Sequence, residues 1–152
     1  MKKVIVLSHC ILNSFCELDK PSNKKLFDQL VVSLINDGIG ILQLPCPELS
    51  YQGLNRKSIT PQDDNAEDYR LFCREILEST IKDLKEYHKN DIDVVKLVGI
   101  ETSPSCSVID PESIMMKELI SEMEKEGITY SRIDMPHDPV SNIEEFIEEI
   151  LA

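Results

Sequence analysis

The chain has 152 residues, of which 28 are Asp or Glu and 16 are Lys or Arg, so its formal net charge is −12. A chain of this length fits one domain, residues 1–152, that buries roughly 70% of its unfolded surface. The charge argues against a nucleic-acid polymer, which requires a Lys/Arg surplus, and no apolar run approaches the ~20 residues of a membrane span, so we expect a cytoplasmic protein.

Apolar runs alternate with amphipathic stretches along the chain. The continuous apolar run at residues 3–7 is typical of a strand buried on both faces. Apolar residues at spacings of three and four predict a helix over residues 23–37. Residues 39–44 then predict a second strand, and after a long loop residues 66–88 predict a second helix.

The second half of the chain repeats this alternation. Residues 94–100 predict a third strand, and Pro111 suits the first turn of a third helix that ends at Gly127. Residues 128–133 form a weaker, alternating pattern that favours an edge strand. A last helix is predicted over residues 141–151.

Strands that alternate with helices predict a parallel sheet with right-handed crossovers and helices on both faces. We expect an α/β fold with a four-stranded parallel sheet in the order 2-1-3-4, a Rossmann- or flavodoxin-like three-layer sandwich. Ligands in such folds bind outside the carboxyl ends of the strands. Functional residues are therefore expected in the loops that follow the strands.

Three of the five cysteines follow the first three predicted strands: Cys10, Cys46 and Cys106. Neighbouring strands lie about 4.8 Å apart, so these three loops can converge on one small inorganic centre. An odd number of cysteines in a cytosolic chain favours such a centre over a disulfide framework. Soft sulfur ligands select zinc, Cu(I) or an iron–sulfur cluster, and three thiolates leave one position open. The pattern does not choose between zinc and a cluster.

The other two cysteines have different surroundings. Cys73 falls on the apolar stripe of the helix at residues 66–88, which predicts a place in the core. Cys16 lies in the loop after the first strand and could be a resolving thiol, a peripheral site residue or a plain loop residue. The last interpretation is favoured.

The residues around Cys46 indicate a reactive site. Pro45 and Pro47 fix the backbone on both sides of this cysteine. The stiffened loop orients Glu48 toward the proposed centre, where a carboxylate can act as a general acid or base.

Other polar residues are candidates for the same site. Ser103 and Ser105 supply hydroxyl groups in the loop that carries the third cysteine. Arg56 and Lys57 could attract an anionic or carbonyl-bearing small molecule, or simply lie in solvent. His137 follows the fourth strand at the same edge and could border the site, although a rigid turn is the favoured interpretation.

Three separated segments stand out: residues 8–13, residues 45–48 with Gly53, Leu54 and Arg56 downstream, and residues 98–106. Together they resemble the thiouracil desulfidase (TudS) family, particularly its shorter, TudS-related type. Residues 68–74 also look like the family's helix, so the resemblance covers nearly the whole chain. One departure is Ser107, which stands where the family usually has glycine.

The resemblance implies a Rossmann-like fold and a [4Fe–4S] cluster with three protein ligands, whose fourth iron takes the sulfur removed from thiouracil. Carried over residue by residue, it makes Cys10, Cys46 and Cys106 the ligands. Glu48 becomes the proton-transfer residue and Ser103 a substrate-site hydroxyl, with Ser105 beside it in the proposed catalytic set of this chain.

We therefore expect an iron–sulfur-dependent desulfidase that acts on a thiolated small molecule, a thio-nucleobase such as 2-thiouracil. Protein handled in air is expected to hold zinc or an empty site instead of the cluster. The alternative function is a non-catalytic metal-, cluster- or sulfur-handling module, or a redox sensor, that uses the same three cysteines. The sequence sets neither the exact substrate nor the oligomeric state.

Overall fold

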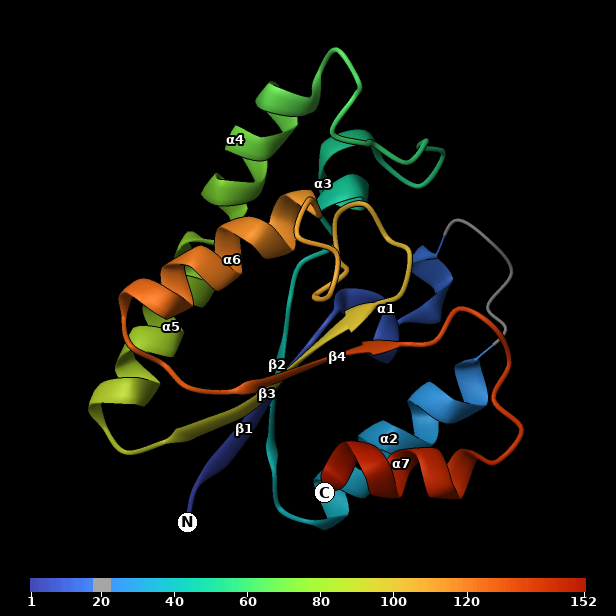
Figure 1. The fold of residues 1–152 in the computed structure, drawn as a ribbon, viewed down its shortest axis with the longest axis vertical. Coiled ribbons are helices and arrows are strands. Elements are labelled where there is room, and N and C mark those ends of the chain that lie inside the picture. The colour runs from blue at the N-terminus through green and yellow to red at the C-terminus, as the bar shows by residue number, and fades with distance from the viewer. Residues whose placement is uncertain (18–22) are drawn as a thin grey trace.

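The computed structural model describes residues 1–17 and 23–152 (Figure 1). This part of the chain forms one parallel sheet of strands β1 (Lys3–Leu7), β2 (Gly40–Gln43), β3 (Asp93–Ile100) and β4 (Ser131–Met135). The strand order is β2-β1-β3-β4. This order confirms the predicted order 2-1-3-4 and the predicted α/β fold class.

The helices lie on both faces of the sheet (Figure 1). They are α1 (His9–Leu12), the 3-10 turn η1 (Ser14–Cys16), α2 (Lys24–Asn36), α3 (Pro47–Gln52), α4 (Ala66–Ile76), α5 (Glu78–Lys89), α6 (Ile114–Lys125) and α7 (Ile143–Leu151). Helices α2 and α7 contact each other on one face, whereas α4, α5 and α6 pack together on the other. The result is the expected three-layer arrangement.

Each face of the sheet has its own apolar cluster. The side chain of Val6 joins the cluster under α4–α6, and its neighbours Ile5 and Leu7 join the cluster under α2 and α7. This division follows from the pleat, which sends successive side chains of a strand to opposite faces. Since both faces are covered, β1, one of the two inner strands, carries the continuous apolar run seen in the sequence.

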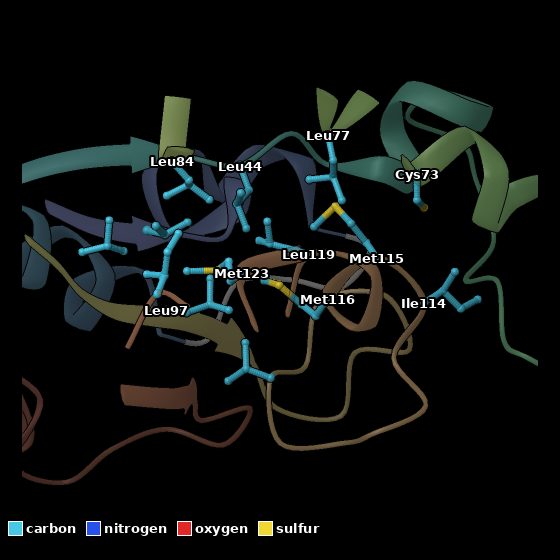
Figure 2. Packing of buried hydrophobic residues seen from close by; sticks show 14 of the residues in the cluster. Leu44, Cys73, Leu77, Leu84, Leu97, Ile114, Met115, Met116, Leu119 and Met123 are labelled. Atoms are coloured by element: carbon cyan, nitrogen blue, oxygen red, sulfur yellow. The ribbon is translucent and has the colours of Figure 1, made fainter. Parts of the chain in front are cut away.

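Helix α6 supplies much of the cluster on its face of the sheet (Figure 2). Met115, Leu119 and Met123 are at most 1% exposed and share this cluster with Leu84 of α5 and Leu97 of β3. Full burial of each such side chain stabilises the fold by roughly 1.5–3 kcal/mol. The face that carries α4–α6 is therefore held mainly by apolar packing.

The prediction of a single helix over residues 66–88 is wrong, because the structure has two helices, α4 and α5, separated by Leu77. Helix α4 contacts α3 and α6, whereas α5 packs on β3 and α6. One straight helix could not reach both sets of partners. The chain turns at Leu77, whose side chain is fully buried at the bend.

The bounds of two later elements also differ from the prediction. Pro111 lies in a turn closed by the bond from Ser113 N to Asp110 O (3.2 Å), so α6 begins at Ile114. The fourth strand covers residues 131–135, not 128–133. Ile128 instead completes the end of α6, where its N–H donates to Met123 O (3.1 Å) after the left-handed Gly127.

Among the described helices, none combines the length and the apolar character that crossing a membrane would require.

Candidate functional site

A cavity of about 220 Å³ lies at the carboxyl edge of the sheet. Residues that follow each of the four strands contribute to its wall, among them Cys10 after β1, Cys46 after β2, Cys106 after β3 and His137 after β4. The structure thus brings the three proposed cysteine ligands to one cavity, at the edge where ligands of such sheets bind.

The loop that carries Cys10 is anchored to both neighbouring strands. The backbone N–H and the hydroxyl of Ser8 both donate to Val98 O, at 3.1 Å and 3.0 Å. The ring Nδ1 of His9 lies 3.2 Å from Leu44 O. These bonds tie the end of β1 to β3 and to the end of β2, so the position of Cys10 is fixed by the sheet.

Cys46 and Glu48 are placed by the start of α3. Cys46 is the residue that precedes the helix, Pro47 is its first residue, and Glu48 follows in the first turn. Glu48 is only 7% exposed. Its Oε2 accepts a hydrogen bond from Ile59 N (2.8 Å), and its Oε1 lies 3.9 Å from Arg56 Nε. A buried carboxylate with one fixed oxygen therefore borders the cavity.

Cys106 is held by the loop that follows β3. Its backbone N–H donates to Ser103 Oγ (3.0 Å), and its carbonyl accepts from Ile100 N (3.1 Å). The next residue, Ser107, donates through its hydroxyl to Asp134 Oδ2 on β4 (2.5 Å). The loop is thus bonded within itself and to the neighbouring strand, and this network holds the thiol at the cavity.

The structure separates the two predicted catalytic serines. Ser103 lines the cavity together with the three cysteines. Ser105 is absent from the cavity wall and is 1% exposed, with its hydroxyl 2.7 Å from Tyr69 Oη. Its side chain turns to α4 because the buried tyrosine hydroxyl of that helix needs a hydrogen-bond partner. The structure therefore does not bring Ser105 together with the other predicted residues.

Cys16 lines the cavity and is 3% exposed, which differs from the favoured interpretation of a plain loop residue. Asn13 begins the short turn η1, and Cys16 Sγ lies 3.0 Å from Asn13 O. The turn places this thiol in the wall of the cavity, which it shares with Cys46. Cys73 is fully buried in the core, as predicted.

The cavity thiols differ in acidity. The hydrogen bond from Cys16 lowers the pKa of Cys46 to about 6, and the positive charge of Arg56 acts in the same direction. Burial raises the pKa of Cys10 to about 12 and raises the pKa of Cys106 well above its usual value. At neutral pH and without a bound metal, Cys46 is therefore the member of this set that favours the thiolate.

Arg56 is a larger part of the site than the sequence indicated. Its side chain is 4% exposed and lines the cavity, so it does not lie in solvent. Its Nη2 donates to the carbonyl oxygen of Cys16 and lies 3.9 Å from Cys46 Sγ. Its buried Nε has no hydrogen-bond partner among the residues that the structure describes. A buried guanidinium thus joins two of the cavity's cysteines.

One wall of the cavity was not predicted. Asn23 and Phe27, at the start of α2, face it. The side-chain amide of Asn23 donates to Pro136 O (2.8 Å) and Asp138 O (2.9 Å), which holds the segment after β4 against α2. Phe27 lies on the apolar stripe of its helix, a pattern that indicates only a core residue. His137 also lines the cavity, as the sequence allowed.

Within residues 1–17 and 23–152, no three His, Cys, Asp or Glu side chains form a group arranged to hold a metal ion. The three proposed cysteines share the cavity wall, but the side chains of the described residues do not define a single-ion centre.

Thr102, at the rim of the cavity, has a strained backbone. It occupies the third position of a turn closed by Ser103 N and Ile100 O (3.2 Å), with φ at +64°. Glycine or asparagine suits that position, and a β-branched residue does not. We expect Thr102→Asn to raise the free energy of unfolding by about 1 kcal/mol, measured by urea denaturation. The matched variant Thr60→Asn changes a threonine whose backbone lies outside the left-handed region, so it should not raise the free energy of unfolding. Equal changes in the two variants would contradict the backbone strain at Thr102.

The fold and the site define a Rossmann-like α/β domain with a cysteine-lined cavity at the carboxyl edge of its sheet. The chain is 35% identical over 136 residues to the uncharacterized protein MJ0003 of Methanocaldococcus jannaschii, an alignment that covers 89% of this chain and 86% of the archaeal one. The chain therefore belongs to the same family as that protein. No family model and no solved structure matches it.

Proposed function

We propose that the chain is an iron–sulfur-dependent desulfidase that removes sulfur from a thiolated small molecule, with 2-thiouracil as the representative substrate. The observation that carries this proposal is the set of side chains around one cavity: Cys10, Cys46 and Cys106 from three different loops, the buried carboxylate of Glu48, and the hydroxyl of Ser103. The resemblance of the same segments to the TudS family adds to it.

The donor set suits a cluster. Cysteine thiolates are the usual ligands of iron–sulfur clusters. Three of the four cysteines in the cavity wall lie in loops that follow strands of the sheet. A four-iron cluster is wider than one ion, so its ligands stand further apart than the ligands of a single metal. A cluster with three protein ligands supplies one iron that is open to sulfur. Cys10, Cys46 and Cys106 would hold it.

Glu48 is suited to move a proton between water and substrate. Its Oε2 is held by Ile59 N, which leaves Oε1 available on the side of Arg56. The neighbouring guanidinium compensates the negative charge of this buried carboxylate. Glu48 can therefore take a proton from the water that attacks the thiocarbonyl carbon and pass it to the sulfur as the C–S bond breaks. The water oxygen becomes the carbonyl oxygen of the product, and the sulfur leaves with the bonding electrons and both water protons, as hydrogen sulfide.

Ser103 is suited to orient the substrate. Its Oγ accepts from the backbone N–H groups of Cys106 (3.0 Å) and Ser105 (3.4 Å). Both contacts use the oxygen as an acceptor, so the hydroxyl hydrogen can donate to a heteroatom of the ring. The hydroxyl is thereby positioned next to the Cys106 ligand.

The test of this proposal is the reaction of anaerobically reconstituted protein with 2-thiouracil, followed by measurement of uracil and sulfide. Glu48→Gln is expected to lower the rate of uracil formation by about 10²–10⁴-fold, the usual contribution of a general acid–base group. Glutamine still offers an oxygen to Ile59 N, so the loop should keep its structure and its iron.

The matched control is Glu101→Gln, a change of an exposed carboxylate at the rim of the same cavity, which should leave the rate close to that of the original protein. Equal rates for Glu48→Gln and the unchanged protein would remove Glu48 from the mechanism. A fully loaded protein that releases neither uracil nor sulfide would contradict the proposed substrate.

The second candidate function is a non-catalytic carrier of zinc or of a cluster, or a redox sensor. The presence of a fourth cysteine, Cys16, in the cavity wall favours it, because a catalytic cluster site needs only three thiolates. Metal and sulfide analysis of anaerobically purified protein separates the two functions. Zinc at one equivalent without sulfide would favour the carrier.

A further inference from the structure

The buried guanidinium of Arg56 has hydrogen-bond donors that the described part of the protein does not use. Its side chain is 4% exposed and lines the cavity. Nη2 donates to the carbonyl oxygen of Cys16, whereas Nε has no partner among the described residues. We propose that Arg56 is a specificity-determining residue that donates to a ring carbonyl oxygen of the substrate, so that the cavity selects neutral oxo-thio heterocycles. This inference rests on the proposed function, whose substrate class it narrows.

An unused donor on a buried charged group is unfavourable. The guanidinium carries five N–H donors and stays charged, and a buried donor without a partner costs the free energy of a lost hydrogen bond. Oε1 of Glu48 lies 3.9 Å from Arg56 Nε, which is longer than a hydrogen bond. An acceptor on a molecule in the cavity therefore completes the bonding of Arg56 without breaking a contact within the protein.

The charges of the cavity wall favour a neutral acceptor over an anion. Among the described residues of this wall, Arg56 is the one Lys or Arg, against the carboxylates of Glu17, Glu48 and Glu101. Glu48 lies beside the guanidinium and balances its charge. A phosphate or carboxylate group would face like charges in the same small cavity, which is costly. A carbonyl oxygen accepts the same hydrogen bond with only a partial charge.

The apolar part of the wall suits a flat ring. Phe27, Ile100, Pro104 and Pro136 all line the cavity. Aromatic and other apolar side chains bury the faces of a heterocycle, while a few polar groups bind its edge. The polar groups here are the Arg56 guanidinium and the Ser103 hydroxyl, so the ring needs acceptors at its edge in addition to the sulfur.

Arg56 also stands next to one of the proposed ligands. Its Nη2 lies 3.9 Å from Cys46 Sγ, so the guanidinium borders the part of the cavity that would receive the sulfur of the substrate. A ring held by its carbonyl at Arg56 and directed with its sulfur toward the cysteines is oriented at two points. A thiolated molecule without the carbonyl keeps only one of them, and it should bind more weakly.

The test is isothermal titration calorimetry of the full chain, freed of metal with a chelator and kept reduced, with two ligands. These are 2-thiouracil and 3,4-dihydropyrimidine-2-thione, which keeps the sulfur and both ring N–H groups but has a methylene group in place of the carbonyl. The unchanged chain is expected to bind 2-thiouracil about 10–100-fold more tightly, the usual effect of a hydrogen bond to a charged group. In Arg56→Met this ratio of Kd values should fall close to one.

The ratio separates recognition from a structural role. Arg56 also holds the carbonyl of Cys16 and balances Glu48, so a purely structural loss would weaken both ligands alike and leave the ratio unchanged. Arg56→Lys keeps the charge beside Glu48 but replaces the guanidinium fork with one ammonium group, so it should fold normally and still lower the ratio. Lys57→Met is the matched control, because Lys57 is exposed and does not line the cavity, and it should keep the original ratio.

Failure of the unchanged chain to bind 2-thiouracil, equal binding of the two ligands, or a ratio that survives in both Arg56 variants would overturn the assignment. Displacement of 2-thiouracil by inorganic phosphate in the unchanged chain but not in Arg56→Lys would show an anion site and overturn the neutral class. These measurements involve no turnover. The carbonyl preference can therefore hold in a protein that releases no sulfide, and it can fail in one that releases sulfide from another thiolated molecule.

Discussion

Replacement of Cys106 by serine is expected to abolish the retention of iron and sulfide by anaerobically reconstituted protein. A serine hydroxyl has nearly the shape of the thiol but is a hard oxygen donor, whereas iron–sulfur clusters select thiolate sulfur. The backbone of residue 106 is bonded to Ser103 Oγ and to Ile100 N, and neither bond uses the sulfur. The loop should therefore survive the substitution while the proposed ligand atom is lost.

The measurements are the broad visible absorbance of the reconstituted protein and its iron and acid-labile sulfide content. Cys73→Ser is the matched control, because Cys73 is fully buried in the core and away from the cavity. This control should bind iron and sulfide like the unchanged protein, although a buried hydroxyl can cost ~1–3 kcal/mol of stability. Equal iron and sulfide in Cys106→Ser and the unchanged protein would show that Cys106 is not a ligand.

Gly99→Ala is expected to lower the free energy of unfolding by about 1–3 kcal/mol and to displace the Cys106 loop. A Cβ at this position of β3 would lie 2.3 Å from the carbonyl oxygen of Cys106, 2.5 Å from Asp134 Oδ1 and 2.9 Å from Val108 Cγ1. The nearest of these atoms is backbone, and the carboxylate is held by Ser107 and the N–H of Val108. Relief of the clash therefore has to move the loop itself.

Urea denaturation of metal-free protein measures the loss of unfolding free energy. Iron retention after reconstitution measures the displacement of the Cys106 loop. Gly40→Ala on β2 is the matched control, since its Cβ would lie 3.2 Å from a methyl group of Val4, a side-chain atom that can shift slightly. We expect that control to stay within about 0.5 kcal/mol of the unchanged protein. Equal effects of Gly99→Ala and Gly40→Ala would show that the close packing of the Cys106 loop against Gly99 does not position that loop.

The gathering of Cys10, Cys46 and Cys106 could be predicted because it depends only on periodic features of the sequence. Apolar runs locate the strands, crossover handedness restricts their order, and the carboxyl ends of parallel strands meet at one edge. The side-chain alternation of β1 and the core position of Cys73 follow from the same periods of two and 3.6 residues.

Side-chain directions within the loops could not be predicted in this way. Ser105 faces Tyr69 on a distant helix, and Arg56 reaches the carbonyl of Cys16, although each is only a polar loop residue in the sequence. The inward position of Cys16 depends on the turn begun by Asn13. Such directions follow from tertiary hydrogen bonds between residues far apart in the chain, which no local pattern encodes. The bend at Leu77 has the same origin, since it depends on the partners of α4 and α5.

Because the cavity takes its wall from the ends of all four strands, it exists only when the whole sheet is assembled. Anything that binds there binds the native state and not the unfolded chain, so its binding free energy adds to the cooperative unfolding of the domain. Hydrogen exchange should then slow together at amides of β1 and β3 far from the cavity, not only in the loops that touch the ligand. Binding at this site would in this way stabilise the whole sheet and not only the loops around the cavity.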